Sequence, residues 1–347
     1  MLKTNHNMYR KIFSILVTAA VAAFVALTGG CSSWTDSEAL DFFSPKPTEE
    51  SNTAYDRNIK EYLKSPHRVM YGWFGSWSGK SNGPKGGSLM GLPDSVDFVS
   101  LWLCWGNLSQ AQQADLKEFQ ARGHRAVLCW RLPNIGSGLT PAGENEAQFW
   151  GYADGTAESY KAAAEKYAMA IADTCRKYNI DGFDADLEDR GTLIPNYFND
   201  FARKLIEEFE KDGRMFMVDI PGGVSWLTPY YSMLADDVID HIQYIAWQTY
   251  EMSSQAQLNS FFNSVRSYKP HKFEHVMTHS IITATFERAA DKHYFLEQIN
   301  NDYTSTEGYK AAGYGAYHIE YDYSSSDGPD YPTVRRGISV LNPPVTD

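Results

Sequence analysis

The sequence has little cysteine, with 4 residues in a chain of 347. Cys104, Cys129 and Cys175 lack the spacing of a metal site, and the 9 histidines show no metal-binding pattern either. The patterns that identify a structural zinc site are therefore missing, and we assign no metal and no cofactor. Cys104 and Cys129 lie near the ends of two expected neighbouring strands, where a disulfide is possible. Packing in the core is the favoured interpretation for them.

Positive charge is also scarce, because 31 Lys and Arg residues stand against 43 Asp and Glu residues, which gives a formal net charge of −12. A chain this acidic is not expected to bind nucleic acid, whose phosphates attract basic surfaces. Aromatic residues, in contrast, are abundant at 14%. Aromatic rings fill the cores of barrels and also stack on sugar rings, so they are compatible with a carbohydrate partner.

Long apolar runs are rare, and the clearest one lies at residues 12–27. It is short for a membrane span and follows the basic residues Lys3, Arg10 and Lys11, which is typical of a secretion signal. Removal of residues 1–30 would make the chain more acidic, because this segment contains no Asp or Glu.

The signal ends in Leu27-Thr28-Gly29-Gly30-Cys31, which resembles a bacterial lipoprotein signal in which the cysteine becomes lipidated. The leucine stands four residues before Cys31, where the usual pattern has three, and a plain secretory signal is the alternative. The next segment is acidic and rich in Ser, Thr and Pro, which is typical of a tether. We therefore predict a signal peptide at 1–30, a tether at 31–54 and one domain at 55–347.

Strand and helix patterns alternate through this domain and predict a parallel α/β fold. Ser109 is a good helix N-cap, and the apolar residues of 157–178 recur at helical spacing, which makes this segment the clearest helix. We expect helices at 109–122, 157–178, 196–211, 254–268 and 285–312. The expected strands are 69–74, 96–102, 126–130, 181–188, 215–220, 242–249, 273–280 and 315–321.

The strand at 181–188 reads DGFDADLE and carries the most informative pattern in the chain. Side chains alternate along a strand, so Asp184, Asp186 and Glu188 are expected on one face and the intervening apolar residues on the other. Three acids on one face of an apolar strand are costly unless something uses or pairs them. We expect one carboxyl with a raised pKa beside others that stay ionised, as a general acid requires. A calcium loop fits poorly, because apolar residues interrupt the acids.

The stretch DGFDADLE matches every specified position of DGxDxDxE and so resembles the signature of glycoside hydrolase family 18. The resemblance implies a single-domain (β/α)8 TIM barrel with this strand fourth. It also implies that Glu188 is the general acid/base, that Asp186 is its partner and that Asp184 tunes Asp186.

The expected sixth strand ends in Gln248-Thr249-Tyr250, where Gln248 and Tyr250 share a face and can each donate a hydrogen bond to a carbonyl oxygen. This Q-x-Y resembles the endo-β-N-acetylglucosaminidases of the family, whereas many of its chitinases carry M-x-Y-D. The third strand also departs from the chitinases, because Cys129-Trp130-Arg131-Leu132 replaces S-x-G-G. The eighth strand lacks the usual tryptophan floor, for which Tyr317 and Tyr321 are the candidates.

Other aromatic and acidic residues near the expected strand ends are candidates for substrate binding, because barrel enzymes keep their chemistry at the C-terminal ends of the strands. The long loop at 131–156 is expected to shape the same cleft. The substrate-binding candidates are Trp73, Trp130, Asp219, Trp247 and Tyr317.

Taken with the resemblance, these patterns predict an endo-β-N-acetylglucosaminidase that cuts the chitobiose core of N-linked glycans by a substrate-assisted, retaining mechanism. Two alternatives stay open, a chitinase acting on chitin oligomers and a non-catalytic glycan-binding surface lipoprotein. The expected partners are N-linked glycans of glycoproteins and, through a lipid on Cys31, a membrane. The expected location is the cell envelope, at the outer-membrane surface.

Overall fold

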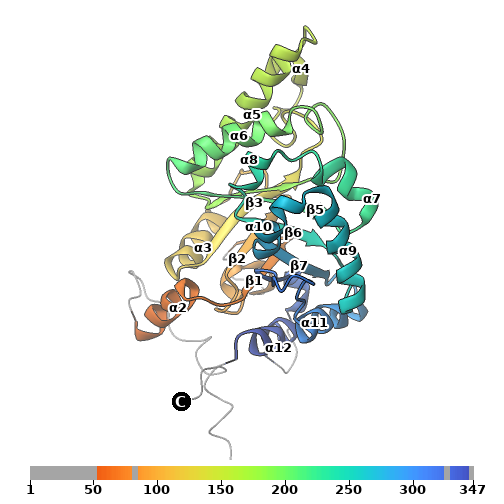
Figure 1. Cartoon of the computed structure of the whole chain (residues 1–347). Coiled ribbons are helices and arrows are strands. Elements are labelled where there is room, and N and C mark those ends of the chain that lie inside the picture. Colours follow the sequence, from red (N-terminus) through yellow and green to blue (C-terminus); the bar gives the residue numbers. More distant parts are fainter. Residues whose placement is uncertain (1–52, 80–84, 324–328, 344–347) are drawn as a thin grey trace, which may run out of the picture. The chain divides into compact units, whose positions relative to one another are not determined.

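The structure is a computed structural model that describes residues 53–79, 85–323 and 329–343 (Figure 1). The expected signal peptide, the lipidation residue Cys31 and nearly all of the tether lie outside these residues. No helix in the described ranges is both long and apolar enough to cross a membrane.

The strands form a closed barrel in which every neighbouring pair is parallel and the order follows the sequence. The first strand pairs with the second on one side and with the eighth on the other, so the barrel closes on itself. This confirms the (β/α)8 barrel that the sequence predicts. The strands are β1 (Val69–Phe74), β2 (Phe98–Trp102), β3 (Arg125–Arg131), β4 (Gly182–Asp186), β5 (Met215–Pro221), β6 (Tyr244–Gln248), β7 (Ser280–Thr285) and β8 (Gly313–Tyr317).

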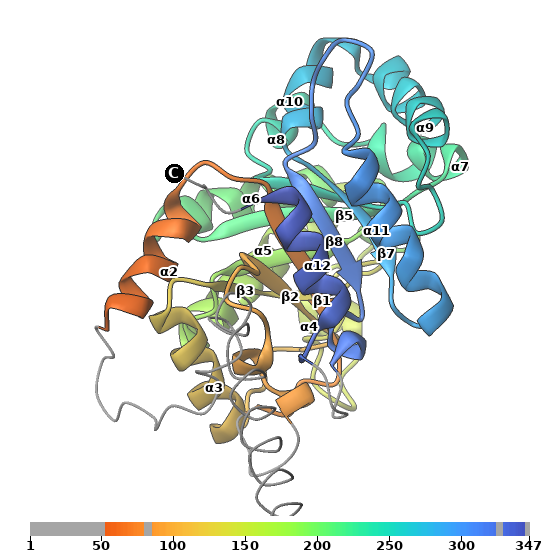
Figure 2. The ribbon, with the colours of Figure 1, turned by 90° about the horizontal axis from the view of Figure 1, so that it is seen from below.

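Helices follow the strands and cover the outside of the barrel. Figure 2 shows α11 and α12 lying beside each other near β7 and β8. The α-helices are α2 (Ala54–Lys64), α3 (Gln110–Ala121), α4 (Glu146–Trp150), α5 (Ala157–Tyr178), α6 (Phe198–Glu210), α7 (Val224–Trp226), α8 (Asp236–Ile239), α9 (Gln255–Tyr268), α10 (Phe273–Thr278), α11 (Lys292–Asn301) and α12 (Pro332–Leu341). Shorter helical turns are η1 (Lys85–Gly87), η2 (Leu89–Gly91), η3 (Leu227–Tyr231), η4 (Pro270–Lys272), η5 (Ala289–Asp291) and η6 (Ile319–Asp322).

The helix ends have local causes that are visible in the sequence. Ser109 caps α3 in a reciprocal capping box with Gln112, as the N-cap prediction requires. Thr156 caps the start of α5, and Asn179 ends that helix in the left-handed conformation at φ 52°. These caps determine where α5 begins and ends, and therefore where the chain turns into β4.

The barrel has two apolar layers because strand side chains alternate between inside and outside. The larger layer lies between the strands and the helices, and it includes Phe183, Ala185 and Leu187 from the DGFDADLE stretch. The smaller layer fills the barrel interior and contains Tyr71, Trp73, Phe98, Val127, Cys129, Met215, Met217, Ala246 and Ile281.

Several predicted elements differ from the structure. Residues 273–278 form α10 rather than a strand, because the buried Phe273, Val276 and Met277 recur at helical spacing, and β7 follows them. The eighth strand ends at Tyr317, because His318 turns into the left-handed region at φ 55° and η6 begins. The helix expected at 285–312 is only α11, and α12 was not predicted.

Candidate active site

Glu188 lies just beyond the end of β4, at the C-terminal mouth of the barrel, rather than within the strand as expected. Each oxygen of its carboxylate has a partner. Gln248 at the end of β6 donates from Nε2 to Oε1 at 2.8 Å, and Nη2 of Arg131 at the end of β3 lies 3.1 Å from Oε2. Tyr230 also donates to the backbone carbonyl of Glu188. Three separate elements therefore fix the position of this carboxylate.

Asp186 and Asp219 lie side by side below Glu188, because β4 and β5 pair these two residues in register. Both are fully buried, and oxygens of Asp186, Glu188 and Asp219 lie within 4.8 Å of one another. Burial, followed by the negative charges nearby, raises the pKa of Asp186 and of Asp219 well above the usual value for an aspartate. Like charges this close disfavour the ionisation of both aspartates at once.

Gln248 links the pair to the acid, because its Nε2 also donates to Oδ1 of Asp219 at 2.6 Å. The predicted residues Gln248, Glu188, Asp186 and Asp219 therefore meet in one network. Oδ1 of Asp186 is buried and has no hydrogen-bond donor among the described residues. This oxygen is a free acceptor directly under the mouth.

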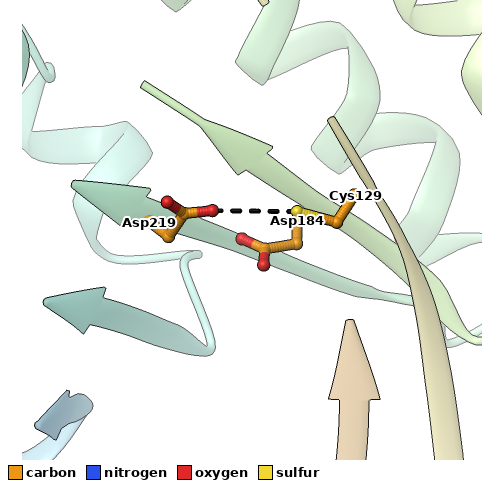
Figure 3. A group of neighbouring side chains, drawn as sticks. All are labelled: Cys129, Asp184 and Asp219. Carbon is orange, nitrogen blue, oxygen red and sulfur yellow. Dashed lines mark hydrogen bonds between the residues drawn. The ribbon is translucent and has the colours of Figure 1, made fainter. Parts of the chain in front are cut away.

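Asp184 lies one pleat deeper in the barrel, where Ser100 donates to Oδ2 at 2.6 Å and Tyr71 at 3.0 Å. Burial raises the pKa of Asp184 to about 6, although these hydrogen bonds oppose the shift. Figure 3 shows Asp184 between Cys129 and Asp219, with the Cys129 thiol directed at Oδ2 of Asp219 at 3.8 Å. Asp184 is thus positioned to influence the aspartates above it.

Tyr250 follows β6 and lies against Tyr317 at the end of β8. Their rings are nearly parallel at 14°, with centroids 6.0 Å apart. Burial, then the charges of Asp219 and Asp186, raises the pKa of Tyr250 well above its ordinary value, so its phenol stays protonated and able to donate. Burial also raises the pKa of Tyr317 to about 12. Tyr250 therefore lies close to the carboxylate network, and Tyr317 lies next to Tyr250 at the mouth of the barrel.

Two predicted substrate platforms are packing residues instead. Trp130 is fully buried and donates to the Tyr167 hydroxyl of α5 at 3.0 Å. Trp247 is also fully buried, donates to Ser280 Oγ at 2.9 Å and packs edge-on against Phe261 of α9. Both side chains point toward the helices, because each stands one residue away from an inward-facing position.

Trp73 and Asp219 do face inward, but neither presents a free surface. Trp73 is almost fully buried beneath Tyr317, with ring centroids 6.2 Å apart, and so supports that ring from inside. Asp219 has a contact inside the barrel on each carboxylate oxygen, from Gln248 on Oδ1 and from the Cys129 thiol on Oδ2. The expectation that Asp219 contacts sugar hydroxyls is therefore replaced by a role within the carboxylate network.

Arg131 is the principal site residue that sequence reasoning missed. Its guanidinium lies near the carboxylates of Asp186, Glu188 and Asp189 at 3.8, 3.1 and 3.6 Å. A signal existed, because β3 and β4 are neighbours in a barrel and their register aligns Arg131 with Asp186. Tyr71 and Ser100, the partners of Asp184, were also missed, and both lie on inward positions of β1 and β2.

Two groups of side chains have ligand atoms close enough to approach one metal ion: Cys129, Asp184 and Asp219, and Asp186, Glu188 and Asp219. Burial raises the pKa of the Cys129 thiol well above its ordinary value, which disfavours the thiolate that a metal needs. In the second group, Arg131 and Gln248 already occupy the Glu188 oxygens. We assign no metal to either group. Cys104, Cys129 and Cys175 are free thiols, so the possible disulfide is not formed.

A closed parallel barrel with a carboxylic acid held at the C-terminal side of β4, over two buried aspartates, is built for general acid–base chemistry at its mouth. The model of glycoside hydrolase family 18, BT1044-like, matches residues 35–199. The solved structure of a selenomethionine BT1044 variant with a glutamate changed to glutamine is 30% identical, with a TM-score of 0.70 over 86% of this chain and 94% of that chain. The chain belongs to glycoside hydrolase family 18.

More distant structures share the fold. An endo-β-N-acetylglucosaminidase from Cordyceps militaris is 20% identical, with a TM-score of 0.59 over 86% of this chain and 99% of that chain. A family 18 chitinase from Pseudoalteromonas aurantia is 10% identical, with a TM-score of 0.53 over 79% of this chain and 100% of that chain. Among curated proteins, no sequence matches significantly.

Proposed function

We propose that the protein is an endo-β-N-acetylglucosaminidase that hydrolyses the β-1,4 bond between the two core N-acetylglucosamines of N-linked glycans. The observation that carries this proposal is the free, buried Oδ1 of Asp186 beside the oriented carboxylate of Glu188. A free acceptor next to a fixed acid suits a substrate that has an amide N–H beside the bond to be cut. A 2-acetamido sugar has such a group.

In this mechanism the substrate supplies its own nucleophile. The acetamido oxygen attacks the anomeric carbon, Glu188 gives its proton to the leaving glycosidic oxygen, and the C–O bond breaks to leave an oxazolinium ion. Asp186 accepts the acetamido N–H and balances the positive charge. Ionised Glu188 then takes a proton from water as the water oxygen attacks the same carbon. The bond between that carbon and the acetamido oxygen breaks, which regenerates the acetamido group and gives a product with the original configuration. Positioning the nucleophile within the substrate can lower the barrier by several kcal/mol, about 7 in good cases.

Gln248 and Tyr250 would complete this arrangement. Gln248 donates to both Glu188 and Asp219, which keeps the acid aligned with the aspartate pair. Tyr250 keeps a protonated phenol next to the same carboxylates and can donate to the acetamido oxygen. Gln248 ends β6 and Tyr250 follows the strand, and this Q-x-Y sequence favours the endoglycosidase over the chitinase.

Two alternative functions are a chitinase and a non-catalytic glycan binder. A chitinase would use the same acid on chitin oligomers, and the family 18 chitinase with the same fold keeps this possibility open. A non-catalytic glycan binder would not need the acid, whereas Glu188 is present and held by partners on both oxygens.

Mass spectrometry of released sugars separates these functions. The purified protein is incubated with a high-mannose glycoprotein, a complex-type glycoprotein and chitin oligomers. We expect released glycans that carry one N-acetylglucosamine at the reducing end, while the second core N-acetylglucosamine stays attached to the glycoprotein. Cleavage of chitin oligomers alone would replace the proposal by a chitinase, and cleavage of none of the three would contradict both enzymes.

We also propose that a lipid on Cys31 anchors the protein to the cell envelope, at the outer-membrane surface. The support is the sequence of the N-terminal segment, with a basic start, an apolar run and small residues before Cys31. A surface anchor would hold the barrel where glycoproteins are accessible.

A further inference from the structure

A hollow at the mouth of the barrel is lined by residues outside the carboxylate network of Glu188. It is a cavity of about 650 Å³ at the C-terminal ends of β1, β2 and β8. We call it the rim pocket and define it by Ser76, Trp102, Leu103, Trp105, Tyr317 and His318. Its volume lies within the range of small-ligand sites, which is roughly 300–1,000 Å³.

The backbone of the rim pocket is strained at three places. Ser76, Leu103 and His318 have φ values of 50°, 57° and 55°, in the left-handed region that side chains rarely adopt. Such strain persists only where the surrounding structure imposes it, and it concentrates at binding and catalytic sites. Here it turns Leu103 and Trp105 outward, leaving them 51% and 41% exposed. Two large apolar side chains therefore face solvent beside a cavity.

Polar groups in the rim pocket are also held in place. Nδ1 of His318 lies 2.7 Å from Oε1 of the buried Glu320, which orients the ring. Gly75 allows this approach, because a Cβ there would lie only 2.7 Å from Glu320 and 2.9 Å from His318. The second oxygen of Glu320 is buried without a hydrogen-bond partner among the described residues. The other nitrogen of this imidazole has no hydrogen-bond partner among the described residues and can therefore bind a ligand.

The position of the rim pocket relative to Glu188 indicates which part of a bound substrate would contact the pocket. In the closed barrel β8 stands opposite β4, which carries the acid site. Tyr317 belongs to both regions, because it lines the rim pocket and stacks on Tyr250. The leaving group lies on the Glu188 side, so a sugar chain that continues from the non-reducing side of the cleaved bond runs across Tyr317 toward the rim pocket.

We propose that the rim pocket binds a neutral sugar residue in an arm of the glycan on the non-reducing side of the cleaved bond. This inference rests on the proposed function. A pyranose ring has an apolar face that stacks on an aromatic ring and a rim of hydroxyls that need directed hydrogen bonds. Trp105 supplies the exposed ring, and His318 supplies the oriented polar group.

The test measures cleavage and binding separately. Trp105→Ala removes the exposed ring. His318→Asn removes the imidazole but keeps a residue that tolerates the left-handed backbone. The control is Tyr55→Ala, because Tyr55 is 53% exposed and contacts Asp94 ahead of β2, at the other end of the barrel. KM and kcat are measured on a glycopeptide with complete arms and on one that carries only the two core N-acetylglucosamines. Calorimetry measures binding of the released, free glycan to Glu188→Gln alone and combined with each change.

We expect Trp105→Ala and His318→Asn each to raise KM for the complete glycopeptide up to about tenfold, as loss of one ring stack or directed contact implies, with kcat little changed. The kinetics on the short glycopeptide should stay at the wild-type values. Binding of the free glycan to Glu188→Gln should weaken by the same factor. Tyr55→Ala should change neither measurement.

The remaining outcomes separate the two proposals. If the wild type cleaves N-glycans but the two pocket changes alter neither KM nor binding, the rim-pocket proposal is overturned and the proposed function stands. An equal loss on both glycopeptides also overturns it, because the effect is then structural. If no glycoprotein is cleaved, yet Glu188→Gln binds the glycan and Trp105→Ala weakens that binding, the rim pocket stands and the proposed function fails. If the glycan neither binds nor is cleaved, both fail.

Discussion

At the mouth of the barrel, the Glu188 carboxylate has an amide donor on one oxygen and a guanidinium on the other. Below it, burial and nearby negative charge raise the pKa of both buried aspartates, and Oδ1 of Asp186 has no hydrogen-bond donor among the described residues. The different environments of Glu188 and of the buried aspartates give these carboxyl groups different roles. The residue at the mouth can exchange protons with a leaving group and with water, whereas the buried pair can only orient and compensate charge.

Glu188→Gln should keep the fold and lower kcat by about 1000-fold or more, because the amide cannot transfer a proton to the leaving oxygen. Single-turnover cleavage of a glycopeptide, with circular dichroism to check folding, measures this. Glu287→Gln is the control, because Glu287 is an exposed glutamate that follows β7. More than a tenth of the wild-type activity in Glu188→Gln would rule out Glu188 as the acid.

Arg131→Gln should lower kcat/KM on a glycopeptide by up to about fivefold, because the guanidinium that holds one oxygen of the Glu188 carboxylate at 3.1 Å is lost. The loss should be modest because Arg131 is 50% exposed, and an exposed ion pair contributes at most about 1 kcal/mol. Steady-state kinetics measures it, and Arg131→Lys, which keeps the positive charge, should stay closer to the wild-type value. A wild-type kcat/KM in Arg131→Gln would show that this contact does not position the acid.

Asp184→Asn should reduce the dependence of stability on pH. Asp184 has a folded pKa of about 6, above the ordinary 3.8, so the folded protein binds the extra proton. Its contribution is therefore complete below pH 3.8 and is lost as the pH rises through 6. Removing this group should make the fall in the free energy of unfolding between these pH values smaller, by up to about 3 kcal/mol. Urea unfolding at several pH values tests this, and an identical fall in both proteins would contradict it.

At the scale of the elements, the direction in which a strand residue faces decides its role. Arg131 and Trp130 are adjacent on β3, yet one contacts the acid site and the other packs against α5. Likewise Gln248 contacts two carboxylates, whereas Trp247 packs against α9. A single residue of register therefore separates a site residue from a packing residue.

Trp247→Ala should destabilise the fold by about 3–5 kcal/mol, because it leaves a cavity between β6 and α9 and removes the donor to Ser280. The control is Trp226→Ala, since Trp226 is 41% exposed and should change the free energy of unfolding by less than about 1 kcal/mol. Chemical denaturation measures both. A Trp247→Ala protein with wild-type stability and a raised KM would restore the sugar-platform interpretation.

At the scale of the whole molecule, the barrel presents its acid site and its rim pocket on the same face, because both lie at the C-terminal ends of the strands. One substrate can therefore contact both. The acidic chain, with a formal net charge of −12, is consistent with a neutral carbohydrate partner rather than a polyanion.

Cys31→Ser should release the protein from the membrane fraction of cells that produce it, because the thiol that we propose carries the lipid is gone. Fractionation with detection of incorporated radiolabelled fatty acid measures this. Cys104→Ser is the matched control and should stay membrane-bound, since Cys104 is a half-buried thiol of the barrel. A protein that carries no label, or one that stays membrane-bound without Cys31, would contradict the anchor.

The sequence by itself determined the barrel and several of the acidic and amide residues that meet at its mouth. Alternation along DGFDADLE separated three acids from three apolar residues, and the spacing of Gln248 and Tyr250 placed two donors at the end of one strand. Local periodicity carries this information because each side chain's direction depends only on its own strand.

Only the tertiary structure determined which residues of different strands contact one another. The contacts of Arg131 with Glu188, the pairing of Asp186 with Asp219 and the rim pocket depend on register and on loop conformations. The outward direction of Trp130 and Trp247 follows from where each strand begins its alternation, and the pattern of apolar residues alone does not settle it when both faces of the strand are buried. Contacts between residues distant in the chain arise only when the barrel closes, which is why the site required the fold.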